Sequence, residues 1–345
     1  MTTLTHSDDL AAVTPGSKSR FRLPVARRSS GEELAISGQV VRGRSSGPTL
    51  LLIANVHGDA IFGAEAVNTA LTRLDPEQLA GTVIGVPVAN PVAFESGTRA
   101  TGQGWNTDMN NMNRVFPGTR QGWITQKMAA VISEEIIPHI DAMLDYHCAG
   151  DTSINYTLVN SDRTPEQKRI FDFTRLMGTD FVFVHDVDPF AGTIDQYVKS
   201  LGKLSIVAEQ GGNVMPEGFA ALTQTRIDNF LKGLGMIDGV PELPERQLLM
   251  RERVLIRADH GGLCYPAVGI EALSTVVAGG TLLSRVVDAH TGETLQEIRA
   301  PYEQSAILQT RPGFSRVNPG DYMYIIADAG SGTWVPSPEQ WRLEV

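Results

Sequence analysis

The sequence predicts an α/β protein, a mixed β-sheet flanked by helices, followed by a small all-β barrel-sandwich domain. Between residues 34 and 234, apolar runs of strand length alternate with segments of helical periodicity, which is the order of βαβ units. After residue 250, short β-type runs are separated by Gly, Asp-Ala and Asn-Pro-Gly turns, which is typical of a small barrel or sandwich. The chain of 345 residues is long enough for one large domain and one small one.

The elements of the first part follow from their apolar patterns. Strands are expected at residues 34–41, 49–55, 82–89, 141–146, 180–185 and 204–209. Helices are expected at residues 63–74, 124–137, 166–177 and 226–234. The run Thr49–Asn55 is almost entirely apolar, which indicates a strand that is buried on both faces. Residues 90–122 are rich in Asn, Gly and Thr, and a loop of that length in a compact domain is usually functional.

Three segments are expected. Residues 1–18 are small and polar and predict a flexible N-terminal arm. Residues 19–240 form the α/β domain, and a proline-containing linker at 238–246 separates it from a β-rich domain at 250–345. In that last domain, strands are expected at residues 254–257, 275–277, 282–288, 306–309 and 322–327.

Composition excludes several classes of protein. The formal net charge of −10 argues against a nucleic-acid partner, which requires a basic surface. No apolar stretch approaches the length of a membrane span, and the first residues lack the apolar core of a signal peptide. Cys148 and Cys264 cannot form a disulfide framework. A cytoplasmic location is therefore expected.

His57 follows directly after a predicted buried strand, where open α/β sheets bind their ligands. Gly58 permits a sharp turn there, and Asp59 could be a metal ligand, a helix N-cap or a solvated loop carboxylate. Taken alone, the tripeptide favours an ordinary turn over a site.

His147 also follows a short predicted strand, and Asp145 precedes it by two residues. Metal-binding imidazoles commonly donate their second ring N–H to an acceptor, which Asp145 could supply. The alternative is that Asp145 is only a strand-end hydrogen-bond partner. Cys148 is expected to point away from His147 as a buried thiol.

Three further polar groups are candidates. Glu209 ends an apolar strand, where a carboxylate is costly unless it is paired, solvated or used as a general base. Arg99 in the long loop offers a forked donor for a carboxylate or a developing oxyanion. The same loop contains Asn111, Asn113 and Arg114, which could equally be ordinary polar surface.

In this order, these residues resemble the succinylglutamate desuccinylase/aspartoacylase family, a branch of the zinc carboxypeptidase-like hydrolases. The matching stretches are Gly47–Pro48, Val56–Asp59, Ala89–Pro91 with Phe94 and Arg99, Asn113–Gly118, Asp145–His147 and Glu209–Gly211. The resemblance spans residues ~35 to ~330, which is nearly the whole chain. It implies hydrolysis of the amide bond of a small N-acyl amino acid or related amine, with one Zn²⁺ per chain.

The resemblance also implies roles for single residues. His57 and His147 match the two zinc-binding histidines, and Glu209 matches the catalytic glutamate that takes a proton from the attacking water. Arg99 matches the arginine that polarises the scissile carbonyl. Asn113 and Arg114 match the pair that holds the carboxylate of the substrate.

Position 60 departs from the family pattern. The family reads His-x-x-Glu, with the glutamate as third zinc ligand, but here Ala60 follows His57 by three residues. Alanine cannot bind a metal, and a catalytic zinc normally has three protein ligands. Three explanations stay open: an engineered substitution that disables the enzyme, a natural non-catalytic binding protein, or compensation by Asp59. Glu65 lies too far along the helix to help. A milder departure is Asn111, where the family usually has Asp.

The sequence is therefore compatible with several functions. The leading one is a zinc-dependent deacylase of N-acyl amino acids, inactive or impaired by Ala60, and the alternatives are a peptide carboxypeptidase and a non-catalytic small-molecule binder. The C-terminal domain resembles biotinyl/lipoyl carrier folds but contains no lysine, so a role as a carrier arm is not expected. We expect this domain to cover the site or to form an oligomer contact, and the chain could form a homo-oligomer. The candidate substrate-facing residues, which the sequence does not rank, are Tyr156, His185, Asp195 and Tyr197.

Overall fold

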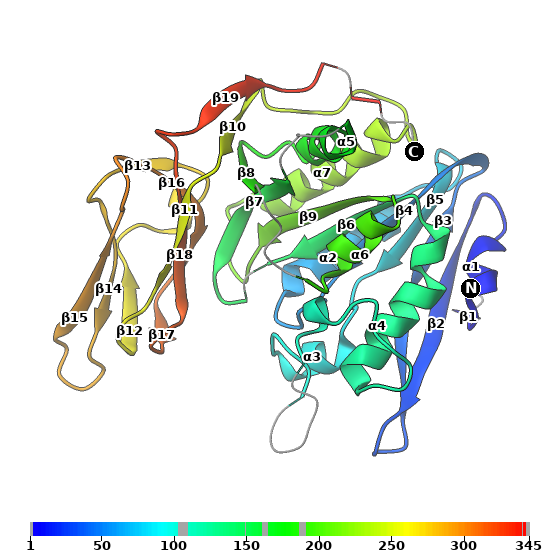
Figure 1. Cartoon of the computed structure of the whole chain (residues 1–345), viewed down its shortest axis with the longest axis horizontal. Helices are drawn as coiled ribbons and strands as arrows, with labels where there is room; N and C mark the ends of the chain where they lie inside the picture. The colour runs from blue at the N-terminus through cyan, green and yellow to red at the C-terminus, as the bar shows by residue number, and fades with distance from the viewer. Residues whose placement is uncertain are drawn as a thin grey trace.

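One mixed β-sheet runs through most of the chain (Figure 1). The computed structural model describes residues 3–102, 110–148, 150–160, 165–185, 191–339 and 341–342. Within these residues, fifteen strands join in one sheet and four more form a second, antiparallel sheet. The predicted α/β fold with an additional β-domain at the C-terminal end is confirmed.

The α/β part carries most of the elements. Its strands are β1 (Thr3–Leu4), β2 (Ser17–Arg27), β3 (Glu33–Arg42), β4 (Ser45–Ala54), β5 (Ala80–Val86), β6 (Ala142–His147), β7 (Ser153–Asn160), β8 (Phe181–His185), β9 (Leu204–Gly211) and β10 (Arg246–Met250). Its helices are α1 (Ser7–Ala11), α2 (Ile61–Arg73), α3 (Pro91–Ser96), η1 (Met112–Arg114), α4 (Ile124–Glu135), η2 (Ile137–His139), α5 (Pro165–Arg175), α6 (Ile194–Ser200) and α7 (Phe219–Gly233).

The centre of the sheet positions the site. Strands β5, β4, β6 and β9 are adjacent and parallel, and β7 continues the sheet antiparallel to β9. Because β4, β6 and β9 run in the same direction, their carboxyl ends meet at one edge of the sheet. His57 follows β4, His147 ends β6 and Glu209 lies near the end of β9.

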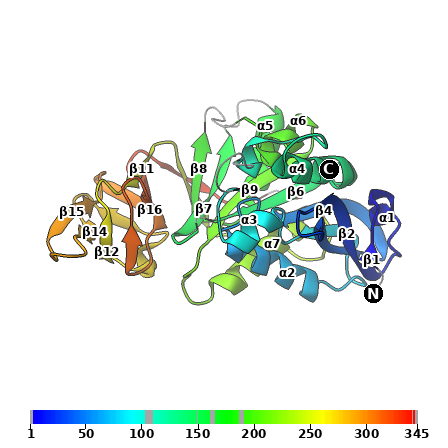
Figure 2. The same cartoon turned by 90° about the horizontal axis from the view of Figure 1, so that it is seen from below.

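Helices cover both faces of this sheet (Figure 2). Leu50 and Leu52 of β4 pack in the core cluster that includes α2, α5 and α7, whereas Leu51 and Ile53 pack in the cluster that includes α4 and α6. This alternation is that of a strand buried on both faces, as the apolar run predicted. Within the part that the structure describes, no helix is long and apolar enough to cross a membrane.

Two segments differ from expectation. The loop expected at residues 90–122 contains α3, because Pro91 occupies the first turn and the Asn90 side chain accepts a hydrogen bond from Ala93 N–H at 3.1 Å. Residues 103–109 of that loop lie outside the described residues. The N-terminal segment is not the expected flexible arm: Leu10 and Val13 are buried in the core cluster beside the sheet, and β1 pairs with β2. The segment is mostly polar, so its composition does not indicate that Leu10 and Val13 anchor it.

Replacing Leu10 by Ala is expected to lower the free energy of unfolding by about 2–5 kcal/mol, because Leu10 is 2% exposed and its removal leaves a cavity. Urea unfolding followed by circular dichroism measures the change. Leu201→Ala is the matched control, since Leu201 is 48% exposed and should change stability by no more than about 0.5 kcal/mol. Equal stabilities of the two variants would show that the segment is a loose arm.

The C-terminal part forms two sheets around its own core. Its elements are β11 (Arg253–Arg257), β12 (Gly262–Pro266), η3 (Ile270–Ala272), β13 (Val276–Ala278), β14 (Leu282–Val287), β15 (Thr294–Arg299), β16 (Gln304–Thr310), β17 (Ser315–Val317), β18 (Tyr322–Asp328) and β19 (Thr333–Pro336). Strand β16 pairs with β7, so the main sheet continues directly into this part. The last residues turn back, and Trp341 packs against the core beside α5 and α7. The division of the chain near residues 240–250 stays a prediction.

Candidate active site

His57 lies in a tight turn between β4 and α2. It is 3% exposed, and its backbone carbonyl accepts a hydrogen bond from Ala60 N–H at 3.2 Å. A Cβ at Gly58 would lie 2.1 Å from the backbone carbon of Ala93, so only glycine allows α3 to approach the turn this closely. The close approach of α3 thereby constrains the backbone of the turn that carries His57.

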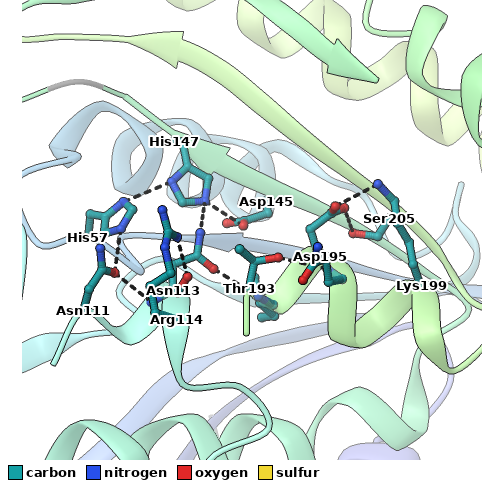
Figure 3. A network of polar contacts seen from close by, with 12 residues as sticks. His57, Asn111, Asn113, Arg114, Asp145, His147, Thr193, Asp195, Lys199 and Ser205 are labelled. Carbon is teal, nitrogen blue, oxygen red and sulfur yellow. Dashed lines mark hydrogen bonds and ion pairs between the residues drawn. The ribbon is translucent and has the colours of Figure 1, made fainter. Parts of the chain in front are cut away.

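His147 is held by the carboxylate on its own strand. Its Nε2–H donates to Oδ2 of Asp145 at 2.7 Å, and Asp145 is fully buried. Both side chains point to the same face of β6 because they are two residues apart. The contact is the one expected from the Asp-Tyr-His spacing, and it leaves Nδ1 of His147 directed toward His57 (Figure 3).

Asn111 fixes the second imidazole in the same way. Its Oδ1 accepts the backbone N–H of Asn113 at 3.0 Å, which determines which amide atom is the oxygen. The same oxygen lies 3.0 Å from Nε2 of His57 and therefore accepts a hydrogen bond from it. Asn111 thus performs the acceptor role that an Asp would have at this position.

The two histidines present their remaining nitrogens to each other. Nδ1 of His57 and Nδ1 of His147 lie 3.2 Å apart, and two lone pairs at that distance repel unless a proton or a metal ion lies between them. Burial, together with Arg99 and His147, holds the pKa of His57 well below its usual range. Burial also acts to lower the pKa of His147, but Asp145 outweighs it and raises that pKa. These opposite shifts favour a proton on His147 over one on His57.

Asn113 and Arg114 line the site beside the histidines. The Asn113 side chain accepts the backbone N–H of Ile194 at 3.0 Å through Oδ1, and its amide nitrogen lies 3.5 Å from Nε2 of His147. Arg114 donates from Nη1 to the backbone carbonyl of Asn113 at 2.6 Å. The loop that carries Asn113 and Arg114, for which the sequence allows either a polar surface or a site, is therefore packed against the histidines. Both side chains line a cavity there.

A cavity of about 720 Å³ opens above the histidines. Glu209 and Arg99 line it, and so do the substrate candidates Tyr156, His185 and Asp195. Glu209 pairs in register with His147 of β6 and with Tyr156 of β7, so the three side chains point to the same side of the sheet. The remaining candidate, Tyr197, packs against the core beside α4 instead.

Position 60, where the family pattern has its third zinc ligand, is apolar in this chain. Ala60 is 1% exposed and belongs to a hydrophobic cluster with Cys148, Ile154 and Tyr156. Burial raises the pKa of the Cys148 thiol to about 12, which keeps it a neutral thiol. Among the residues that the structure describes, no group of three His, Cys, Asp or Glu side chains is placed to hold a metal ion together.

Asp59 lines the same cavity and is partly buried. Burial raises its pKa, and its buried Oδ1 has no hydrogen-bond partner within the described chain. In this position it does not form a three-ligand group with the histidines, so its compensating role stays a prediction.

Several lining residues were missed because they come from the C-terminal domain. Arg253, Leu255 and Arg257 of β11 face the cavity, whereas Val254 and Ile256 pack against the core of their own domain. The alternation Arg-Val-Leu-Ile-Arg is a two-residue period that could have indicated a charged, ligand-facing side of this strand.

Comparison with known proteins identifies relatives of the chain. The model of the succinylglutamate desuccinylase/aspartoacylase catalytic domain matches residues 46–237. The N-alpha-acetyl-L-2,4-diaminobutyric acid deacetylase of Halomonas elongata is 31% identical over 319 residues, which are 89% of this chain and 90% of that protein.

Two solved structures share the fold across nearly the whole length. The product-bound ectoine utilization protein EutE (DoeB) of Ruegeria pomeroyi is 25% identical, with a TM-score of 0.76 over 92% of this chain and 98% of that one. A succinylglutamate desuccinylase/aspartoacylase of Rhodobacter sphaeroides is 26% identical, with a TM-score of 0.73 over 89% of this chain and 94% of that one. The chain therefore belongs to the succinylglutamate desuccinylase/aspartoacylase family.

Proposed function

We propose that the chain carries the site of a zinc-dependent deacylase of small N-acyl amino acids or related amines, in which Ala60 has removed one metal ligand and impaired hydrolysis. The observation that carries the proposal is the pair of facing Nδ1 atoms, 3.2 Å apart, at the base of a cavity lined by Arg99, Arg114 and Glu209. The deacetylase relative from Halomonas elongata acts on the same class of substrate.

The two histidines fit a zinc ion as two of its ligands. With zinc–nitrogen distances of about 2.0–2.1 Å, two ligands of a tetrahedral site lie roughly 3.3 Å apart, close to the separation of the two Nδ1 atoms. Both rings donate their other N–H to an oxygen acceptor, Asp145 or Asn111, as metal-bound imidazoles usually do. When bound, zinc would polarise a carbonyl and lower the pKa of a water.

The protein groups supply the rest of the chemistry. Glu209 is partly buried at the end of β9 and can take a proton from the attacking water and return it to the leaving amine. Arg99 can donate to the oxyanion that develops on the carbonyl oxygen. Asn113 and Arg114, beside the histidines, would hold the carboxylate of the amino-acid half.

Ala60 also supports the alternative of a non-catalytic binding protein. The alanine is buried among apolar side chains, so this region is packed and does not leave an open coordination position. The other proposed binding groups, Arg99, Asn113 and Arg114, line the cavity. The impaired deacylase and the non-catalytic binding protein would bind the same class of ligand. The two hypotheses differ in whether Ala60 replaced a functional glutamate or is the native residue.

A peptide carboxypeptidase fits the cavity less well. The C-terminal domain contributes Arg253, Arg257 and Tyr322 to the wall that faces the catalytic residues. A wall on that side limits the length of the acyl half, which favours a small molecule over a polypeptide. We also place the chain in the cytoplasm, where its two buried cysteines would remain free thiols.

A ligand panel tests this function on the chain as it stands. N-acyl amino acids are expected to bind with a measurable heat by titration calorimetry and to raise Tm, because binding to the native state stabilises it. Free amino acids and N-acylated tripeptides are the comparison sets and should bind at least roughly tenfold more weakly. Tighter binding of the tripeptides would favour the carboxypeptidase, and no binding of any N-acyl compound would overturn the proposal.

A further inference from the structure

A second cavity, of about 310 Å³, lies between the first turn of α7, strand β7 and the segment after η3. Asn155 of β7 lines it, whereas Ile154 and Tyr156, the two neighbours of Asn155, line the cavity of the histidines. Because successive side chains of a strand point to opposite faces, the two cavities lie on opposite faces of β7. The second cavity is therefore separate from the candidate active site.

Arg226 of α7 lines this second cavity with a charge that is not paired. The side chain is 2% exposed, and its Nη1 donates to Oδ1 of Asn155 at 2.9 Å. Its buried Nε has no hydrogen-bond partner, and no carboxylate forms an ion pair with it in the part of the chain that the structure describes. Burial lowers the pKa of Arg226 to about 10, so the guanidinium is still charged at neutral pH. A buried charge without a counter-charge is costly, and an anionic group bound beside it would offset that cost.

The first turn of α7 adds positive potential to the same space. The helix has fifteen residues, no side chain caps its N-terminus and no acidic residue lies in its first turn. Gly218 and Phe219, where the helix begins, both line the cavity. Helical side chains lean toward the N-terminus, and the Arg226 guanidinium accordingly lies 5.6 Å from the centroid of the Phe219 ring. The helix end and the guanidinium thus both favour a carboxylate in this cavity.

The remaining lining residues restrict which anion fits. Asp180 and Glu217 line the cavity and are exposed, so they carry negative charge on its solvent side. They would repel a ligand with several negative charges and attract one whose carboxylate has a cationic neighbour. Pro216, Leu222 and Leu273 supply apolar surface for a short side chain. A buried cation, an acidic entrance and an apolar wall together match a small zwitterion.

We propose that this cavity binds a free α-amino acid with a short apolar side chain. Its carboxylate would lie on Arg226 and the first turn of α7, and its ammonium group near Asp180 and Glu217. A volume of about 310 Å³ suits a ligand of that size. The site does not depend on the proposed function, because it is built from the opposite face of β7.

Three matched compounds test the site by titration calorimetry on the whole chain. L-valine has both charged groups, 3-methylbutanoate lacks the ammonium group and 2-methylpropylamine lacks the carboxylate. L-valine is expected to bind at least roughly tenfold more tightly than either of the other two, because each charged group adds a charge-assisted hydrogen bond. Equal affinity for L-valine and 3-methylbutanoate would overturn the proposal in favour of a plain anion site, and no binding of L-valine would overturn it outright.

Two variants locate the binding. Arg226→Gln should weaken L-valine at least roughly tenfold. Since a change at this buried position could also impair folding, Leu222→Trp is the second variant: Leu222 is 42% exposed, and the larger ring should fill the cavity and abolish L-valine binding. Leu201→Trp is the matched control, because Leu201 is 48% exposed and lines neither cavity, and it should bind L-valine like the parent chain.

A variant at the entrance tests the ammonium group. Glu217→Gln should reduce the preference for L-valine over 3-methylbutanoate, because it removes one of the two negative charges there. L-valine binding that survives both Arg226→Gln and Leu222→Trp would place the ligand elsewhere and overturn the proposal. Leu222→Trp should bind N-acyl amino acids like the parent chain, so a failure of those compounds to bind concerns the proposed function and not this site.

Discussion

Replacing Ala60 by Glu is expected to give a chain that retains about one zinc ion and releases free amine from N-acyl amino acids. The parent chain should retain little zinc and hydrolyse these compounds at least roughly 10³-fold more slowly, because a metal ion contributes several kcal/mol of transition-state stabilisation. His57 and His147 already present both Nδ1 atoms at the separation of two ligands, so one added carboxylate completes the usual three.

The local structure favours this rescue. Position 60 is in the same turn as His57, since Ala60 N–H donates to the His57 carbonyl, and it is the N-cap of α2. A carboxylate at a helix N-terminus is electrostatically favourable. The added side chain must displace apolar contacts of the cluster around Cys148, so we expect a lower Tm without zinc and a recovery of Tm with zinc.

Zinc content by plasma emission spectrometry and amine release from an N-acyl amino acid panel measure the outcome. Ala60→Gln is the control, because it has the size of glutamate without its charge and should neither retain zinc nor hydrolyse. About one zinc per parent chain would instead support Asp59 as a compensating ligand. Failure of Ala60→Glu to bind zinc would refute the enzyme function for this scaffold.

The outcome also separates the three explanations for Ala60. If Ala60→Glu recovers both zinc binding and hydrolysis, Ala60 is a disabling substitution in an otherwise complete site. Rescue of zinc without hydrolysis supports a natural binding protein whose other groups have diverged. Asp145 and Asn111 each accept a hydrogen bond from one imidazole, which leaves the two Nδ1 atoms facing each other, as the proposed metal site requires.

The sequence was sufficient to predict the elements around the site. The apolar run before His57 and the Asp-Tyr-His triplet at the end of β6 are local patterns, and the strand that each predicts is present. The parallel order of β4, β6 and β9 then brings residues about 90 and 60 positions apart to one edge, a consequence of the α/β fold class and not of any single motif.

The sequence was insufficient where contacts are long-range. The alternation around Arg253 indicates a charged side of β11, but not that this side faces the cavity of the histidines, because that depends on the pairing of β16 with β7. The composition of the N-terminal segment predicts an arm, because its polar residues outnumber Leu10 and Val13, the two that anchor it. The geometry between Asn111 and His57, 54 positions apart, likewise depends on how α3 and η1 pack.

Replacing Glu209 by Gln in the Ala60→Glu chain is expected to reduce hydrolysis by roughly 10²–10⁴-fold while zinc content and substrate affinity remain unchanged. Glutamine has the shape of glutamate but cannot take a proton from water or return one to the leaving amine. Glu209 points to the same side of the sheet as His147, its register partner, so its carboxylate is placed to act on a water beside the histidines.

Steady-state kinetics and calorimetry on the same preparations separate the proton-transfer role from binding. The expected pattern is a fall in kcat with a KM that changes little, since the interaction is used in the transition state. Asp321→Asn is the matched control: Asp321 lines the same cavity from the C-terminal wall, so its loss should change kcat by less than about threefold. If Glu209→Gln retained more than about a tenth of the activity, Glu209 would not be the general base. Asp59 would become the candidate, because it lies two residues after His57 and lines the same cavity.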